Sequence, residues 1–160
     1  FFTLPDSLIQ KQFSRIMSLR DGLKKMSKSE LSDLSRINLT DEKDLIINKI
    51  KKAKTDPLPI PSSVEELNQR PEAKNLIGIY SSLSGFSLEK IFKDFSGKNF
   101  SEFKENLSQV LVDKILPISI EIKKLLNDKS YLDKILLEGC ESANKIASKK
   151  VKKVHEIVGF

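Results

Sequence analysis

Hydrophobic residues recur three and four positions apart through most of the chain beyond residue 40, which is the spacing of one helix face. The first such pattern places Ile46, Ile50 and Ala53 on one side, with acidic residues ahead of them and lysines behind. Thr40 suits the N-cap of this segment. Acidic residues at the start and basic residues at the end complement the helix dipole. The pattern therefore predicts a helix that begins directly after Thr40.

Two shorter helical patterns follow a loop with three prolines over residues 57–63. The first starts at Pro71 and stops at Gly85, residue types favoured at those two ends. The second has Ser87 as its N-cap and Gly97 as its stop. We expect their apolar faces to form core: Leu76, Ile79, Tyr80, Leu83, Leu88, Ile91, Phe92 and Phe95, with Phe100 and Phe103 beyond.

Two long amphipathic patterns complete the chain. The first, over residues 99–128, contains Pro117, which removes a backbone donor and is expected to kink or split the helix. The second spans residues 130–158 and has lysines mostly opposite its apolar face. That face comprises Leu132, Ile135, Leu136, Ala143, Ile146, Ala147, Val151 and Val154. The chain is therefore predicted to be mainly α, with five or six helices.

One short stretch near the N-terminus predicts a strand. Ser14–Leu19 is a brief apolar run, and Asp21-Gly22 behind it is a turn signal. A single strand leaves its backbone groups without partners. We therefore expect residues 1 to about 20 to belong to a sheet that lies mostly outside this chain.

The charge balance favours an anionic partner without choosing one. Lysine and arginine number 28 against 22 acidic residues, giving a formal net charge of +6. Such a surface suits a nucleic acid, a nucleotide or a membrane surface, and it equally serves solubility alone.

Other single residues add little chemistry. Cys140 is the one cysteine, which fits a reducing compartment and predicts a small buried thiol. His155 is interpreted as a surface or capping residue, and no Cys/His spacing predicts a metal site. Residues 1–13 lack a basic leader, and no apolar run approaches the ~18 residues of a membrane span, so no membrane association is predicted. The chain begins at Phe1 rather than Met, which we interpret as the start of a fragment.

The segment KMSKS, Lys25–Ser29, carries the strongest chemical signal. It lies directly after the predicted strand and directly before the helical region. A flexible loop with two ammonium groups, hydroxyls and backbone N–H groups can surround a polyphosphate. Donors aimed at phosphates that gain charge lower the barrier of phosphoryl or nucleotidyl transfer.

KMSKS in this setting resembles the second signature of class I aminoacyl-tRNA synthetases. The wider string over residues 15–56 resembles tryptophanyl-tRNA synthetases of the bacterial or organellar type, and the likeness continues through RPEAKNLIGIYSSLSG, YLDKILLEGCESANKIA and the terminal VGF. Members of the family often have a small or acidic residue directly after this motif, and here it is Glu30.

The resemblance implies a reaction and site residues. Tryptophan and ATP, with Mg²⁺, form an adenylate and pyrophosphate, and the tryptophanyl group then passes to tRNA(Trp). The resemblance implies that Lys25 and Lys28 are the catalytic residues. It also implies an ATP site formed by Ile16, Lys25, Met26, Ser27, Lys28 and Ser29. Lys149, Lys150 and Lys153, on the last helical segment, are candidate tRNA-binding residues.

The resemblance also implies an organisation. Residues 1–36 would end a Rossmann-like nucleotide-binding catalytic domain, and residues 37–160 would form a helical anticodon-binding domain. The first signature motif and the tryptophan pocket would precede this chain, so the fragment alone is expected to be inactive. The full-length protein would be a homodimer of the bacterial cytoplasm, or alternatively of an organellar matrix. A standalone helical RNA-binding or interaction module with a vestigial loop is the alternative.

Overall fold

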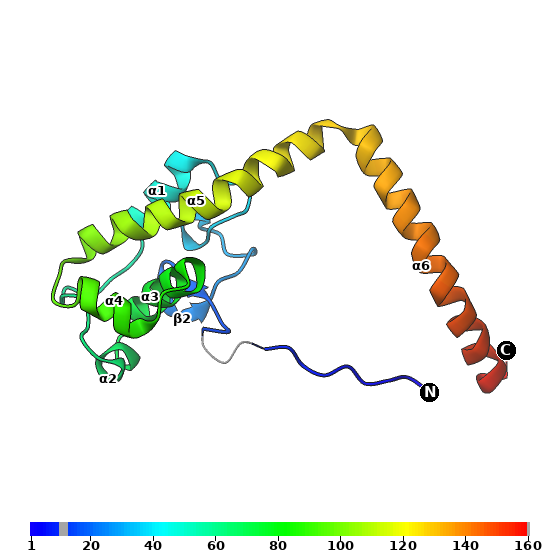
Figure 1. The fold of residues 1–160 in the computed structure, drawn as a ribbon, viewed down its shortest axis with the longest axis horizontal. Helices are drawn as coiled ribbons and strands as arrows, with labels where there is room; N and C mark the ends of the chain where they lie inside the picture. The colour runs from blue at the N-terminus through cyan, green and yellow to red at the C-terminus, as the bar shows by residue number, and fades with distance from the viewer. Residues whose placement is uncertain (10–12, 160) are drawn as a thin grey trace. The chain divides into compact units, whose positions relative to one another are not determined.

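Helices dominate the computed structural model, which describes residues 1–9 and 13–159 (Figure 1). The mainly α prediction is confirmed. Two short strands and a 3₁₀ turn, η1, precede six α-helices in the described residues. The elements are β1 Met17–Ser18, β2 Asp21–Lys25, η1 Asp33–Ser35, α1 Lys43–Lys51, α2 Val64–Asn68, α3 Pro71–Ser84, α4 Leu88–Phe95, α5 Phe100–Asn127 and α6 Lys129–Val158.

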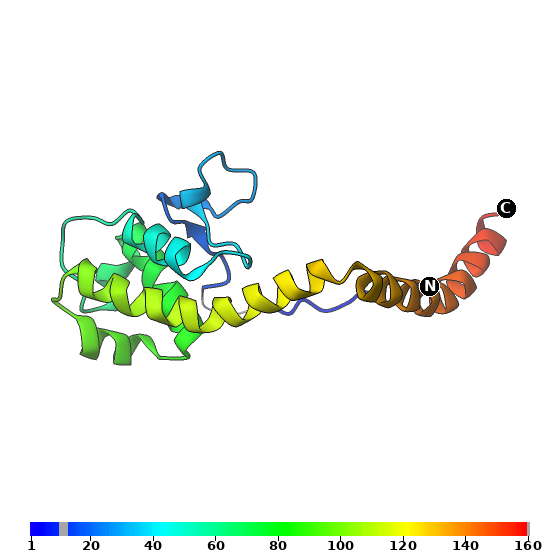
Figure 2. The same ribbon diagram turned by 90° about the horizontal axis from the view of Figure 1, so that it is seen from above.

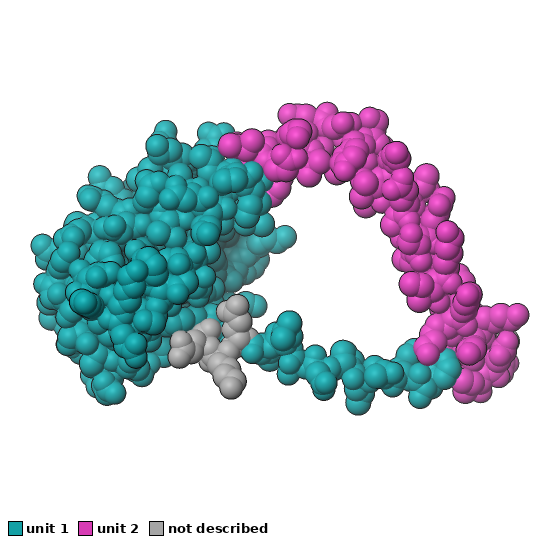
Figure 3. All heavy atoms as spheres, viewed as in Figure 1, with its two compact units in different colours: residues 1–119 teal, residues 120–160 magenta. Residues whose placement is uncertain are grey.

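The described residues group into two compact units, 1–119 and 120–160 (Figure 3). In the first unit, α1, α3, α4 and the first part of α5 lie side by side in both ribbon views (Figures 1 and 2). Their inward faces supply most of one hydrophobic core. The predicted core positions are buried or packed against it, and Phe95 and Phe103 meet edge to face at 5.2 Å between ring centroids.

Local capping signals set the ends of α3 and α4 as predicted. Pro71 is the first residue of α3, and Gly85 follows its last turn with φ of 75°. The Ser87 side chain accepts a hydrogen bond from the Lys90 N–H and begins α4. Helix α4 ends at Phe95, two residues before Gly97, which again has φ of 75°. A left-handed backbone at these glycines ends a helix without a steric cost.

Helix α1 begins later than predicted. Its N-cap is Glu42 rather than Thr40, and its first helical residue is Lys43. The Asp41 carboxylate accepts hydrogen bonds from the Asn38 N–H and from Lys49, so Asp41 completes the turn ahead of the helix instead of joining it.

Of the kink or split expected at Pro117, the split does not occur. Helix α5 runs without a break from Phe100 to Asn127 with Pro117 inside it. Proline removes one hydrogen bond, and the remaining bonds of a 28-residue helix keep the turns on both sides helical.

Asp21 and Gly22, predicted to form a turn, lie instead in strand β2. The turn lies at Leu19-Arg20, and β2 begins with Asp21 and pairs antiparallel with β1. Asn75 of α3 completes the outer edge of β1: its Oδ1 accepts from the Met17 N–H at 2.9 Å, and its Nδ2 donates to the Met17 carbonyl at 2.8 Å. A helix side chain therefore supplies the partner that a further strand would otherwise supply.

The prediction that Cys140 is buried is wrong. Its thiol is exposed on α6, a helix that contributes no buried residue within the described part of the chain. The apolar spacing predicted the helix correctly. Spacing alone, however, does not show whether another part of the protein packs against the apolar side of a helix. Among the described residues, none of the helices has the length and apolar character needed to cross a membrane.

Candidate functional site

The KMSKS segment begins where β2 ends. Lys25 is the last residue of β2 and lies opposite Met17 of β1. The next residue, Met26, donates its backbone N–H to the carbonyl of Ile16 at 3.1 Å. The strand pair thus fixes the first end of the loop and joins two residues predicted for the ATP site.

The tip of the loop is held by its own serines. The Ser27 and Ser29 hydroxyls lie 2.9 Å apart, and the Ser29 N–H donates to Ser27 Oγ at 3.3 Å. Lys28 lies in a turn between them and is exposed. The segment therefore presents two serine hydroxyls beside an exposed lysine.

The loop carries two positive charges without local compensation. The Lys25 and Lys28 side chains are exposed, and neither ammonium makes an ion pair or hydrogen bond to any residue that the structure describes. Their neighbour Lys24 differs, because its Nζ lies 3.8 Å from Asp21 Oδ2. Two cations without carboxylate partners beside serine hydroxyls form a donor set that suits a polyphosphate.

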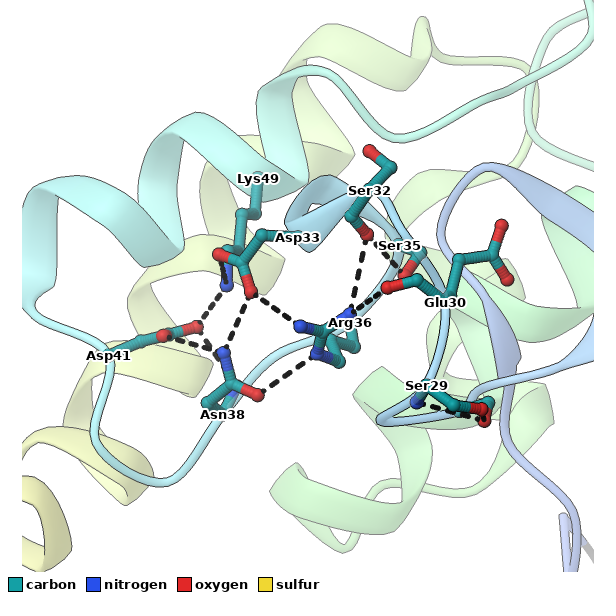
Figure 4. A network of polar contacts seen from close by, with 10 residues as sticks. Ser29, Glu30, Ser32, Asp33, Ser35, Arg36, Asn38, Asp41 and Lys49 are labelled. Atoms are coloured by element: carbon teal, nitrogen blue, oxygen red, sulfur yellow. Dashed lines mark hydrogen bonds and ion pairs between the residues drawn. The ribbon is translucent and has the colours of Figure 1, made fainter.

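Behind the loop, a polar network links its second end to α1 (Figure 4). Arg36 Nη1 donates to the Glu30 carbonyl at 3.0 Å, and Arg36 Nη2 lies 3.1 Å from Asp33 Oδ1. The ammonium of Lys49, whose side chain is fully buried, lies 2.7 Å from Asp33 Oδ2 and 2.6 Å from Asp41 Oδ2. The hydrogen bond from Lys49 is the main reason that the pKa of Asp33 lies below its usual value.

Asn38 holds the middle of this network. Its Nδ2 donates to Asp33 and to Asp41, at 3.1 Å in both cases, and its Oδ1 accepts from Arg36 Nε at 3.3 Å. Two cations and two carboxylates thus balance, and the amide fills the remaining hydrogen-bonding positions. Buried charges are tolerated in proteins only when they are paired and hydrogen-bonded in this way.

Ile16 and Met26 lie partly buried against the hydrophobic core. Ile16 also lines a hollow of about 550 Å³ that is bordered by Phe13, Met17 and residues of α3. None of Lys25–Ser29 lines this hollow. The structure therefore brings Ile16 and Met26 together through the backbone, and leaves the lysines of the loop outside the hollow.

The predicted tRNA-binding lysines all lie on α6, within residues 120–160. Lys149, Lys150 and Lys153 are exposed along it. His155 is exposed near the C-terminal end of α6. Its carbonyl accepts a hydrogen bond from the N–H of Gly159, the residue that caps the helix. In the described part of the chain, no group of three His, Cys, Asp or Glu side chains is placed to hold a metal ion.

The sequence did not lead us to the network behind the loop. One signal was available: Lys49 stands beside Ile50 and three positions after Ile46, both on the apolar face of its helix. A lysine at the border of an apolar face is usually solvated, because its long stem reaches water. The positions of Asp33 and Asp41, both ahead of the helix that carries Lys49, explain its burial.

Comparisons with known proteins identify relatives of the family that the KMSKS segment resembles. The family model described as class I tRNA synthetases (W and Y) matches residues 1–115. A tryptophan–tRNA ligase of Mesorhizobium japonicum is 48% identical over 160 residues, which is 100% of this chain and 45% of that protein. A tryptophan–tRNA ligase of Rickettsia felis is 52% identical over 157 residues, 98% of this chain and 47% of its own length.

Solved structures share the fold. The crystal structure of tryptophanyl-tRNA synthetase from Campylobacter jejuni, complexed with ADP and tryptophan, superposes with a TM-score of 0.68 at 22% identity. That match covers 99% of this chain and 48% of the other. The Mycoplasma pneumoniae enzyme gives a TM-score of 0.59 at 26% identity over 72% of this chain and 36% of its own. The chain thus spans less than half the length of these relatives.

Proposed function

The chain belongs to the family of class I tRNA synthetases for tryptophan and tyrosine, and from this membership we propose that it is the C-terminal part of a tryptophan–tRNA ligase. The similarity to tryptophan–tRNA ligases extends over the whole chain and supports tryptophan over tyrosine. The full-length protein would join tryptophan to ATP as an adenylate, release pyrophosphate, and transfer the tryptophanyl group to tRNA(Trp).

The observation that carries the proposal is a pair of lysines that have no partner among the described residues, Lys25 at the end of β2 and Lys28 in the turn beyond it. Lys25 and Lys28 would bind the phosphates of ATP and stabilise the charge that develops on departing pyrophosphate. The Ser27 hydroxyl would donate to a phosphate oxygen, and Ser29 would close the loop through its contact with Ser27. Met26 and Ile16 would lie beside the nucleotide.

Mg²⁺ would accompany the nucleotide, supplying charge neutralisation to the phosphates when bound. The described residues contain no cluster of ligands for it, and we assign none of them to the metal.

The remaining parts of the proposal concern the full-length protein. Residues 1–36 would end the catalytic domain, and residues 37–160 would form the helical region that binds tRNA, with Lys149, Lys150 and Lys153 facing its phosphates. The full-length protein would be a homodimer in the bacterial cytoplasm or in an organellar matrix.

A double substitution tests the role of the loop. In the full-length protein, Lys25→Ala with Lys28→Ala should slow adenylate synthesis by at least about a hundredfold, because removing one donor to a developing oxyanion costs ~10²–10³ in rate. The measurement is tryptophan-dependent ATP–pyrophosphate exchange. Lys43→Ala with Lys52→Ala removes the same charge from exposed positions at the two ends of α1 and should leave the rate unchanged.

A normal exchange rate in the Lys25/Lys28 variant would contradict the proposed role. The alternative, a standalone helical RNA-binding module, predicts a native gene product close to 18.1 kDa rather than about twice that mass. An intact mass measured on the native protein separates these two readings.

A further inference from the structure

The two ends of the KMSKS loop are held in different ways. At the first end, the β1–β2 pairing and the Met26 N–H to Ile16 carbonyl bond involve backbone atoms only. At the second end, Arg36 Nη1 donates to the Glu30 carbonyl, and more weakly to the Ser32 carbonyl at 3.5 Å. Among the described residues, Arg36 is the side chain from outside residues 25–31 that bonds this segment.

Two side chains, Asp33 and Asn38, orient Arg36 for this contact. Its guanidinium directs Nη2 to Asp33, Nε to Asn38 and Nη1 to the loop carbonyls, and 17% of the side chain is exposed (Figure 4). A planar guanidinium makes such divergent bonds in fixed geometry, whereas a lysine ammonium is a single point charge. Because each of its three nitrogens already lies against an acceptor, Arg36 differs from Lys25 and Lys28, which have no described partners.

The partners of Arg36 are themselves anchored to the helical region. Asp33 pairs with Lys49, and Asn38 donates to Asp41, which also pairs with Lys49. The buried Lys49 belongs to α1. The second end of the loop is therefore connected, contact by contact, to the first helix of the core. A side chain held in this way restricts the positions that Lys28 and Ser29 can take.

We propose that Arg36 is a positioning residue that fixes the second end of the KMSKS loop, so that Lys28 is held in place for the phosphates without Arg36 touching the nucleotide. The inference rests on the proposed function of the loop. It deepens that function by naming the residue on which the loop's geometry depends.

The test uses two measurements on the full-length protein that carries Arg36→Ala. A lysine-specific protease should cut the Lys28–Ser29 bond about tenfold faster, because freeing a carbonyl from a charged donor loosens the loop by roughly that factor. In ATP–pyrophosphate exchange, the apparent KM for ATP should rise about tenfold while that for tryptophan stays unchanged. A loss of fold would alter both KM values and the thermal unfolding midpoint.

Two further variants sharpen the result. Arg20→Ala is the matched control, since Arg20 Nη1 also donates to a backbone carbonyl, that of Lys52, away from the loop. It should leave cleavage and both KM values unchanged.

Arg36→Lys preserves the charge beside Asp33 and so protects the fold. Because one ammonium cannot reach Asp33, Asn38 and the Glu30 carbonyl together, its cleavage rate should be intermediate.

The outcomes separate this inference from the proposed function. Unchanged cleavage and an unchanged KM for ATP in Arg36→Ala, with exchange abolished in the Lys25/Lys28 variant, would overturn the role of Arg36 and leave the function standing. Faster cleavage without any change in the KM for ATP would also overturn it, since the loop would then be loosened without consequence. A normal exchange rate in the Lys25/Lys28 variant would overturn both.

Discussion

At the scale of single residues, burial separates lysines that look alike in sequence. Lys25 and Lys28 are exposed and have no described partners, whereas the Lys49 ammonium lies fully buried between two carboxylates. Exposed cations keep their charge available for a ligand. A buried cation must be paired where it is, because desolvation of a lone charge is costly.

Lys49→Met should lower the free energy of unfolding by about 3–5 kcal/mol, because it leaves the buried Asp41 carboxylate without its cation. Urea denaturation at neutral pH measures the loss. Lys51→Met, two residues later on the exposed side of α1, is the control and should change stability by less than ~0.5 kcal/mol. Adding Asp41→Asn to Lys49→Met should restore part of the loss, and a Lys49→Met protein as stable as the wild type would refute this account.

At the scale of elements, the strand that leads into the loop is fixed by close contact with α3. A Cβ added to Gly22 of β2 would lie 2.6 Å from the Pro71 carbonyl carbon and 2.7 Å from the Glu72 nitrogen, both backbone atoms. Asn75, one turn further along α3, bonds the edge of β1. Helix α3 thus determines where the strand pair lies, and through it where the loop begins.

Gly22→Ala should therefore destabilise the protein by about 1–3 kcal/mol, the range for overpacking at a site whose neighbours cannot move aside. Gly139→Ala offers the opposite case, because it lies within α6 with no atom in reach of an added Cβ. That change should be neutral or stabilise by up to ~1 kcal/mol, since alanine favours the helix. Chemical denaturation compares the two, and equal stabilities would show that the contact at Gly22 is not tight.

At the scale of the whole molecule, the two compact units differ in how many buried residues they contain and in where their lysines lie. All buried residues in the described part of the chain lie within residues 1–119, including the aromatic cluster of Tyr80, Phe95, Phe100 and Phe103. Residues 120–159 are mostly helical and exposed along most of their length, with lysines concentrated over residues 145–153. Exposed lysines spread along a helix suit an extended polyanion better than a small ligand.

Reversing the charge of Lys149 and Lys150 together should weaken tRNA binding by the full-length protein and flatten its salt dependence. Each lost phosphate contact removes about 0.7–0.9 from the slope of log K against log salt. Filter binding at several salt concentrations gives both quantities. Lys43→Glu with Lys52→Glu produces the same change in net charge on the first unit, so equal effects from the two pairs would assign the result to net charge alone.

Local chemistry was enough to predict much of the fold and the loop. The starts of α3 and α4, the glycine at the end of α3 and the apolar spacing of the core helices depend on residues within one or two turns of each other. Helix α2 was missed although its signal was present: Ser63 is followed three residues later by Glu66, and Ser63 caps the helix. The KMSKS loop was found because its residues are consecutive.

The sequence by itself thus determined most of the helical segments and the short segment that we propose binds phosphates, because these properties depend on near neighbours along the chain. Tertiary structure decided that Asp21-Gly22 forms a strand, that Asn75 bonds the edge of that sheet, that Cys140 is exposed and that Arg36 is tied through Asp33 to Lys49. The strand depends on its pairing with β1, and the Asn75 bond joins residues 58 positions apart. The exposure of Cys140 reflects the absence of a buried face on α6 in the described part of the chain. The pairing and the burial of such groups follow from what lies beside them in space, which no local pattern records.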